Sequence, residues 1–274
     1  MTAPILVFDS GVGGLSVLAH LRSQLPEHPF VFACDNAALP YGTKPVAWLR
    51  QRIVVVCQSA VRETGACALV VACNTASTVA LDDLRQALAV PVIGTVPAIK
   101  PAAEQSQRGV IGVLATTTTI NGVYLQRLVQ QFASQCDVVN IAADALVGQA
   151  ERKMRGDALD DAVLEDLLAP LWAHPLLDIV VLGCTHFPLV KEECERIARA
   201  HGRGEIRWLD SGAAIARRTA NIVANMPPSK DGLLTADAHY SLATAPDAPG
   251  LEQALAGMNV PPVRCLMVEM PANA

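Results

Sequence analysis

Short apolar runs alternate along the chain with longer segments in which apolar residues recur at helical spacing. The apolar runs lie at 5–8, 30–33, 68–72, 90–94, 109–115 and 178–183. The segments of helical period lie at 14–25, 46–65, 75–88, 122–133 and 157–173. Such alternation is typical of βα units built around a parallel sheet, so the sequence predicts an α/β fold.

The alternating pattern weakens after Pro227, where Pro, Ala and Asp become frequent. Two short apolar stretches in this part of the chain, LLTA at 233–236 and VRCLMVEM at 263–270, are the candidates for edge strands. The sequence therefore predicts a less regular C-terminal segment that follows the main α/β units.

Two pairs of segments resemble each other and suggest an internal repeat. VFDSG at 7–11 resembles WLDSG at 208–212, and ALVVACNTAST at 68–78 resembles DIVVLGCTHFP at 178–188. The second pair aligns Cys73 with Cys184, which lie 184 − 73 = 111 residues apart, about the length of one small α/β domain. Because ligands of open α/β sheets bind outside the carboxyl ends of strands, we expect a cleft with one thiol on each wall.

Composition and charge narrow the class of protein. The 274 residues are 51% apolar and 17% charged, and no apolar run reaches the 18 residues of a membrane span, which predicts a globular protein without a membrane partner. A net charge of -5 gives no general attraction to nucleic acid. The N-terminus shows no secretory signal pattern, so we expect reduced thiols and a cytoplasmic location.

Metal and cofactor sites have little support in the sequence. The eight cysteines form no CxxC pair and the six histidines form no HxxxH or HExxH motif, which argues against a zinc site. Among five lysines only Lys44 lies beside a candidate loop, which argues against pyridoxal phosphate. The sequence therefore predicts no metal and no cofactor.

Cys73 and Cys184 differ from the other cysteines because each follows an apolar strand and precedes a turn or helix. Cys73 is followed by Asn74 and Thr75, and Cys184 by Thr185 and His186. A helix N-terminus stabilises a thiolate relative to a thiol, so we expect lowered pKa values at both cysteines. The neighbouring hydroxyl and amide groups are able to hold a carboxylate.

Asp9 ends the first strand and precedes the glycine-rich run GVGG. It is either the N-cap of the next helix or a cleft residue that meets a substrate ammonium or a proton on Cys73. The glycines also allow a dinucleotide-binding interpretation, with Asp35 after the second strand as the ribose ligand. Ser16 stands where the third glycine of that motif is required, which weakens this alternative.

Two further loops follow predicted strands and contain polar or turn-forming residues. Pro40, Tyr41 and Gly42 form a turn that is either a binding loop or an ordinary surface turn. Thr116 to Thr119 place hydroxyls after another strand, where they either bind a ligand or cap a helix. His186 is the histidine with the clearest chemical neighbours, since the other five have none that the sequence shows.

Two thiols on related strand ends suit a symmetric reaction. If one thiolate removes a proton from an amino-acid α-carbon and the opposite thiol delivers another, the configuration inverts without a cofactor. The reverse direction exchanges the two roles.

Five segments in order, DSGVGGLSV, DNAALPYG, ACNTAST, GVLATTTT and GCTHFPLV, closely resemble the glutamate racemases. The resemblance implies two flavodoxin-like domains related by a pseudo-twofold axis, residues 1–97 plus 208–274 and residues 98–207, with the active site between them. It implies interconversion of L- and D-glutamate, a small-molecule substrate, as a source of D-glutamate for peptidoglycan. A homodimer stays open.

The resemblance also implies roles for individual residues. Cys73 would deprotonate D-glutamate and Cys184 L-glutamate, with Asp9 and His186 assisting the thiols. The implied substrate contacts, with those expected from the loops, are Asp9, Ser10, Pro40, Tyr41, Gly42, Asn74, Thr75, Thr116, Thr119, Thr185 and His186.

One position departs from the family pattern. Many relatives have a glutamate directly after a Leu-Val pair, whereas Leu146-Val147 is followed here by Gly148, with Glu151 three residues later. Activation through a long N-terminal extension, as in some members, is not expected because Asp9 lies so near the start. The alternatives are a racemase of aspartate or hydantoins, a non-catalytic solute-binding protein, and a nucleotide-binding enzyme.

Overall fold

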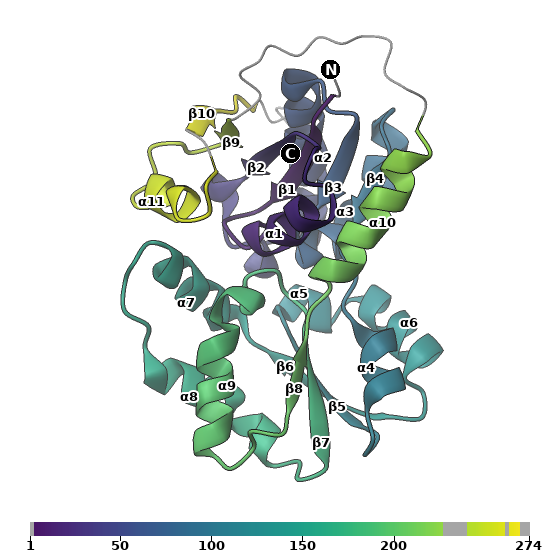
Figure 1. Ribbon diagram of the computed structural model, residues 1–274, viewed down its shortest axis with the longest axis vertical. Helices are drawn as coiled ribbons and strands as arrows, with labels where there is room; N and C mark the ends of the chain where they lie inside the picture. Colours follow the sequence, from purple (N-terminus) through teal and green to yellow (C-terminus); the bar gives the residue numbers. More distant parts are fainter. Residues whose placement is uncertain (1–2, 227–239, 261–262, 269–274) are drawn as a thin grey trace.

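The computed structural model describes residues 3–226, 240–260 and 263–268. Two lobes, each built on a parallel sheet, lie one above the other in Figure 1. The first sheet has the order β10-β9-β2-β1-β3-β4. Its strands are β1 (Ile5–Asp9), β2 (Phe30–Cys34), β3 (Ala68–Val71), β4 (Val92–Gly94), β9 (Ser241–Ala243) and β10 (Val263–Cys265).

Helices cover both faces of the first sheet, which is why its central strands are continuous apolar runs. Leu6 and Phe8 of β1 belong to the core on one face, and Ile5 and Val7 to the core on the other. The helices of this lobe are α1 (Leu15–Gln24), α2 (Val46–Thr64), α3 (Asn74–Ala87), α10 (Gly212–Ala224) and α11 (Leu251–Ala256), with short 3₁₀ turns η1 (Asn36–Ala38) and η2 (Tyr41–Thr43).

The second sheet has the order β6-β5-β7-β8 and is likewise parallel throughout. Its strands are β5 (Val110–Ala115), β6 (Asp137–Ala142), β7 (Leu177–Leu182) and β8 (Arg207–Leu209). Its helices are α4 (Ile99–Gln105), α5 (Thr117–Ile120), α6 (Val123–Phe132), α7 (Asp144–Met154), α8 (Asp161–Trp172) and α9 (Lys191–Ala200), with a 3₁₀ turn η3 (Phe187–Val190).

The two sheets repeat one topology. In each, the first four strands in chain order are arranged second, first, third, fourth, as in flavodoxin-like folds. Cys73 lies just beyond the third strand of the first sheet, and Cys184 just beyond the third strand of the second. The α/β class and the equivalence of the two cysteines are therefore confirmed.

The other pair of similar segments is not part of this repeat. Asp9 ends the first strand of its sheet, whereas Asp210 follows the fourth strand of the other. Both segments form the same local turn, in which the carboxylate accepts a hydrogen bond from the N–H two residues later, that of Gly11 or Gly212. The VFDSG and WLDSG similarity thus reflects a shared turn, and its interpretation as repeat equivalence is wrong.

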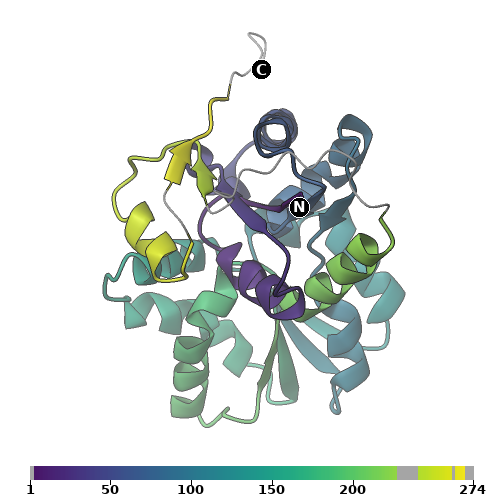
Figure 2. The same ribbon diagram turned by 45° about the horizontal axis from the view of Figure 1, so that its top comes forward.

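The chain crosses between the lobes twice, after β4 and after β8. The hydroxyl of Ser211 on the second crossing donates to the carbonyl of Val96 on the first, and α10 then packs against α1 (Figures 1 and 2). The expected domain boundary between 207 and 208 falls inside β8, which pairs with β7 in the second sheet.

Several predicted elements have different bounds in the structure. The helix expected over 157–173 begins only at Asp161, because Asp160 is its N-cap and accepts the N–H groups of Ala162 and Val163. VRCLMVEM contributes an edge strand over 263–265, and its described residues 266–268 lie outside a strand. The LLTA segment at 233–236 lies outside the described residues.

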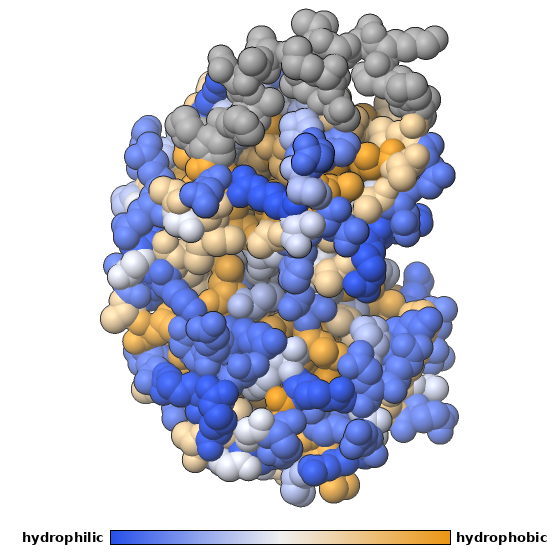
Figure 3. All heavy atoms as spheres, viewed as in Figure 1, coloured by the Kyte–Doolittle hydropathy of each residue, from blue (hydrophilic) through white to orange (hydrophobic). Residues whose placement is uncertain are grey.

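The surface is mixed in character. Figure 3 shows hydrophilic side chains over both lobes of one face, with smaller apolar areas between them. Across residues 3–226, 240–260 and 263–268, no helix combines the length and hydrophobicity that crossing a bilayer requires.

Candidate active site

Cys73 is the N-cap residue of α3, at the point where β3 ends. Its Sγ accepts a hydrogen bond from the N–H of Ala76 at 3.5 Å, and its side chain is buried. Burial, with the nearby charge of Asp9, raises the pKa of the Cys73 thiol well above its ordinary value, and the Ala76 N–H only partly offsets this. The expected lowering of the pKa at Cys73 is therefore wrong, because desolvation outweighs the helix N-terminus.

Asp9 lies near Cys73 and forms a hydrogen bond from the first lobe to the second. It has no solvent exposure, and its carboxylate accepts hydrogen bonds from the hydroxyls of Ser10 at 3.0 Å and of Thr185 at 2.8 Å. Burial raises the pKa of Asp9, against the opposing charge of His186 and these hydrogen bonds. Gly14, and not Asp9, is the N-cap of α1, so the capping alternative is wrong. Ser10 Oγ lies 3.8 Å from Cys73 Sγ.

Cys184 lies in the turn after β7, next to a buried chain of charged groups. Its Sγ is 3.8 Å from Nδ1 of His186, and Nε2 of His186 is 2.8 Å from Oε1 of Glu151. Burial opposes a charge on His186, but the hydrogen bonds to Cys184 and Glu151 raise its pKa well above the ordinary value. Burial likewise opposes the charge of Glu151, yet His186 and the N–H of Val12 lower the pKa of Glu151. Each partner therefore favours the charged form of the other.

The GVGG loop of the first lobe lies directly against this pair. Val12 N donates to Oε1 of Glu151 at 2.9 Å, and a Cβ at Gly13 would lie 2.4 Å from Nδ1 of His186. A Cβ at Gly11 would lie 2.3 Å from the same carboxylate oxygen of Glu151. These glycines allow close approach between the lobes, a role that accounts for them without a dinucleotide.

Hydroxyl groups from both lobes meet at the opposite side of the site. Thr75 Oγ1 and Thr116 Oγ1 lie 3.0 Å apart, and Thr116 Oγ1 lies 3.1 Å from Thr119 Oγ1. All three residues are buried, and Thr116 makes no side-chain cap to α5. Thr118 donates from its hydroxyl to the carbonyl of Gly42 at 2.7 Å, which joins the second lobe to the Pro40–Gly42 loop.

The Pro40–Gly42 loop presents backbone rather than side chains to the site. The hydroxyl of Tyr41 donates to Asp35 at 2.6 Å, away from the threonines, and its ring is buried against Phe8. Pro40 is exposed. A Cβ at Gly42 would lie 2.7 Å from Cβ of Thr116, so the loop backbone lies directly against the second lobe.

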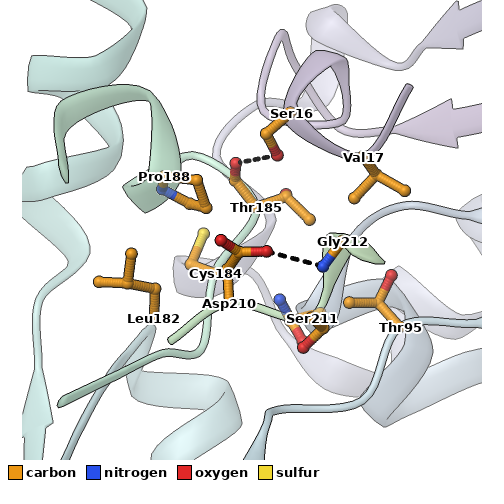
Figure 4. A pocket seen from close by; sticks show the side chains of 11 residues that line it. Ser16, Val17, Thr95, Leu182, Cys184, Thr185, Pro188, Asp210, Ser211 and Gly212 are labelled. Carbon is orange, nitrogen blue, oxygen red and sulfur yellow. Dashed lines mark hydrogen bonds between the residues drawn. The ribbon is translucent and has the colours of Figure 1, made fainter. Parts of the chain in front are cut away.

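Asn74 has a buried side chain, and among the residues that the structure describes its Oδ1 has no hydrogen-bond partner. A buried unpaired amide oxygen is costly, and an ammonium donor would satisfy it. Asn74 and Cys184 line a small cavity of about 10 Å³. Figure 4 shows this cavity with Cys184 labelled. Cys73 is close enough for the charge of Cys184 to contribute to its raised pKa.

Sequence reasoning missed part of this cavity wall. Ser16, whose hydroxyl donates to the carbonyl of Thr185 at 2.8 Å, lines it together with Thr95, Asp210 and Ser211 (Figure 4). The signal for Asp210 and Ser211 is the WLDSG segment, whose similarity to VFDSG marks the turn that contains them. His20 and His201 also have neighbours that the sequence did not show, Asp210 at 3.8 Å and Glu165 at 2.8 Å. Within the described ranges no three His, Cys, Asp or Glu residues gather as a metal site would require.

The sequence pattern of the family described as Asp/Glu/Hydantoin racemase matches residues 15–219. The chain belongs to this family. Among its members, the glutamate racemase of Shewanella sp. (strain ANA-3) is 45% identical over 242 residues, 88% of this chain and 86% of the relative. That of Pectobacterium atrosepticum is 46% identical over 230 residues, 82% of this chain and 78% of the relative.

Solved structures of family members have the same architecture. Escherichia coli glutamate racemase, in complex with L-glutamate and the activator UDP-MurNAc-Ala, superposes with a TM-score of 0.90 at 39% identity, covering 98% of this chain and 100% of that one. Thermus thermophilus glutamate racemase, in complex with β-chloro-D-alanine, gives a TM-score of 0.72 at 32% identity, covering 98% and 99%. The two-sheet α/β fold is therefore that of the family's glutamate racemases.

Proposed function

We propose that the protein is a glutamate racemase that interconverts L- and D-glutamate with two thiols and no cofactor. The observation that carries the proposal is the placement of Cys73 and Cys184 at equivalent strand ends of two sheets with one topology. The identity to relatives named glutamate racemase, over more than four fifths of the chain, supports glutamate as the substrate.

In this mechanism each thiol serves one face of the α-carbon. The Cys184 thiolate removes the α-proton of L-glutamate, and the electron pair of the broken C–H bond stays on the substrate as a carbanion. The Cys73 thiol then gives its proton to the opposite face, which forms D-glutamate and leaves a Cys73 thiolate. The raised pKa of Cys73 fits its role as proton donor in this direction. From D-glutamate the two roles are exchanged.

Asp9 and His186 assist the thiols as positioning and proton-exchanging groups. Asp9 acts beside Cys73, which it influences through its charge and through Ser10. His186 acts beside Cys184 at 3.8 Å.

Glu151 takes the place of the glutamate that many relatives have directly after Leu-Val. It reaches His186 at 2.8 Å, whereas Gly148 is exposed and an added Cβ there would meet open space. The two positions are one helical turn apart on α7, so a carboxylate moved from one to the other stays on the same side of the helix.

Substrate binding relies mainly on amide, hydroxyl and backbone groups. The Asn74 amide oxygen accepts from the α-ammonium, and Asp9 is the candidate carboxylate partner of the same ammonium. Hydroxyls and backbone N–H groups hold the carboxylates. They come from Ser10, the Pro40–Gly42 loop with Tyr41, Thr75, Thr116, Thr119, Thr185 and His186.

We also propose the organisation and setting of the enzyme. The first domain combines residues 1–97 with the C-terminal part of the chain, and the second runs from 98 through β8, slightly beyond the expected boundary at 207. D-glutamate would be supplied for peptidoglycan in the cytoplasm, where a reducing environment fits eight free cysteines. A homodimer stays open.

The test is circular dichroism or polarimetry of purified protein with L-glutamate and separately with D-glutamate, after dialysis against a chelator in the presence of reductant. We expect both solutions to reach the same racemic end point. L-aspartate and a hydantoin serve as comparison substrates. No turnover of either glutamate enantiomer, or faster turnover of aspartate or hydantoin, would refute the proposal.

A further inference from the structure

The carboxylate of Asp35 lies at the end of β2 with no solvent exposure and with four hydrogen bonds. Oδ1 accepts from Nη2 of Arg52 and from the hydroxyl of Thr244, each at 2.7 Å. Oδ2 accepts from Nε of Arg52 at 2.9 Å and from the hydroxyl of Tyr41 at 2.6 Å. A carboxylate offers about four lone-pair sites, so its accepting capacity is used. These four residues are called the Asp35 network below.

The Asp35 network leaves no room for a ribose at this aspartate, which removes the sequence basis for the nucleotide-binding alternative. It also places an ion pair in the interior, since the Arg52 side chain is only 12% exposed. The hydrogen bond to Asp35 raises the pKa of Arg52, so the guanidinium stays charged. Buried ion pairs seldom exceed a packed apolar replacement in stability, which points to a role in fixing geometry.

The geometry that the network fixes is that of the Pro40–Gly42 loop. Of the network residues, Tyr41 lies within that loop. Its hydrogen bond to Asp35 and its buried ring fix the position of the first residue of η2. The next residue, Gly42, contacts the second lobe through the hydroxyl of Thr118 and lies against Thr116. A shift of Tyr41 would therefore move backbone that lies against Thr116, one of the proposed substrate contacts.

The C-terminal segment holds the turn η1, which precedes the Pro40–Gly42 loop in the chain. Thr244 also accepts the N–H of Ala37 at 3.1 Å. The side chain of Asn36 donates to the carbonyl of Ala245 at 2.7 Å and accepts its N–H at 2.9 Å. Residues 244–245 follow β9, which pairs with β2. The last part of the chain thus reaches the substrate loop through Asp35.

We propose that Asp35, Arg52 and Thr244 are positioning residues that hold the Pro40–Gly42 backbone in place to bind a glutamate carboxylate, so that the C-terminal segment is a structural part of the substrate site. This inference rests on the proposed racemase function and on the loop contacting substrate. None of the three side chains touches the reacting atoms. Their loss should weaken binding of both enantiomers and leave the proton transfers largely intact.

The test uses Tyr41→Phe and Thr244→Val, which remove one hydroxyl each and keep side-chain shape. We expect KM for L- and for D-glutamate to rise about tenfold in each variant, about 1.4 kcal/mol, with kcat changed by less than about threefold. The matched control is Asp83→Asn. It disrupts the exposed bidentate pair between Asp83 of α3 and Arg50, which lies on α2 as Arg52 does, at 2.8 and 2.7 Å. This variant should leave KM and kcat unchanged.

Arg52→Lys separates positioning from simple stabilisation. Lys keeps the charge but lacks the planar fork that holds both carboxylate oxygens, so KM should rise here as well. A purely structural role would lower Tm and leave KM unchanged in Tyr41→Phe, Thr244→Val and Arg52→Lys, and that result would overturn the inference. Absence of racemisation in the wild type would instead refute the proposed function, so the two failures are distinguishable.

Discussion

At the residue scale, the proposed mechanism makes the two thiols non-interchangeable, because each would serve one face of the α-carbon. We expect Cys73→Ala and Cys184→Ala each to lower racemisation in both directions on the order of a thousandfold or more. Stability should change by only about 1 kcal/mol, since each substitution removes one buried atom. Steady-state rates and urea unfolding of the two variants check both statements. Near-normal turnover by either variant would contradict the two-thiol mechanism.

The Glu151 and His186 pair should make stability depend on pH. The pKa of His186 is raised in the folded protein, so its stabilising effect is complete below its ordinary value of 6.5 and is lost as the pH rises through the raised value. The lowered pKa of Glu151 means that its own contribution is lost only as the pH falls below its ordinary value of 4.5 and through the lowered value.

Glu151→Gln should therefore lower the free energy of unfolding most near pH 6, by about 1–3 kcal/mol, and less near pH 9. Urea unfolding at both pH values measures this. Glu165→Gln is the matched control, because Glu165 contacts His201 at the same 2.8 Å but both side chains are about 40% exposed. An exposed pair contributes little at either pH. A difference for Glu151→Gln that grows with pH would show that the pair is not charged as described.

At the element scale, two glycines in different settings should respond oppositely to alanine. A Cβ at Gly13, in the loop before α1, would overlap the His186 ring at 2.4 to 2.8 Å, whereas Gly148 within α7 has nothing within 4 Å. Gly148→Ala should stabilise α7 by up to about 1 kcal/mol with activity retained. Gly13→Ala should separate the loop from His186 and lower activity at least tenfold. Tm and kcat/KM measure both, and equal effects of the two substitutions would contradict the close interlobe contact.

The elements that sequence predicts well are those buried on both sides. Continuous apolar runs such as 68–72 and 109–115 become central strands, because helices cover both faces of their sheets. β6 was not predicted, since it is an edge strand with several exposed residues and no clear apolar run. β8 and β9 are only three residues long, too short to show a period.

At the scale of the whole molecule, the site is formed where the lobes meet. The cysteines, Asn74 and Asp9 were predictable because each follows a strand at the edge where parallel sheets bind ligands. The sequence shows no partner for Glu151 and suggests for Asp35 only a ribose, because His186 and Thr244, their partners in the structure, lie 35 and 209 residues away along the chain. A local sequence pattern does not show how deeply a side chain is buried. At Cys73 the resulting desolvation raises the pKa, which is opposite to the expected change.

Hydrogen bonds between the lobes surround the site on several sides. They include Thr185 to Asp9, Ser16 to Thr185, Val12 to Glu151 and Thr118 to Gly42. We expect such a closed arrangement to limit access of water to the thiols while substrate is bound. A proton taken from substrate by one thiol should then exchange slowly with solvent during the lifetime of the complex.

Isotope exchange in deuterated water tests the central claim most directly. Starting from L-glutamate, the enantiomers are separated at early times and the deuterium at the α-carbon of each is measured by mass spectrometry. We expect D-glutamate to carry deuterium and the remaining L-glutamate to stay protonated, because Cys184 removes the proton and Cys73 delivers a solvent-derived one. Deuterium entering L-glutamate as fast as D-glutamate forms would contradict two separate bases on opposite faces.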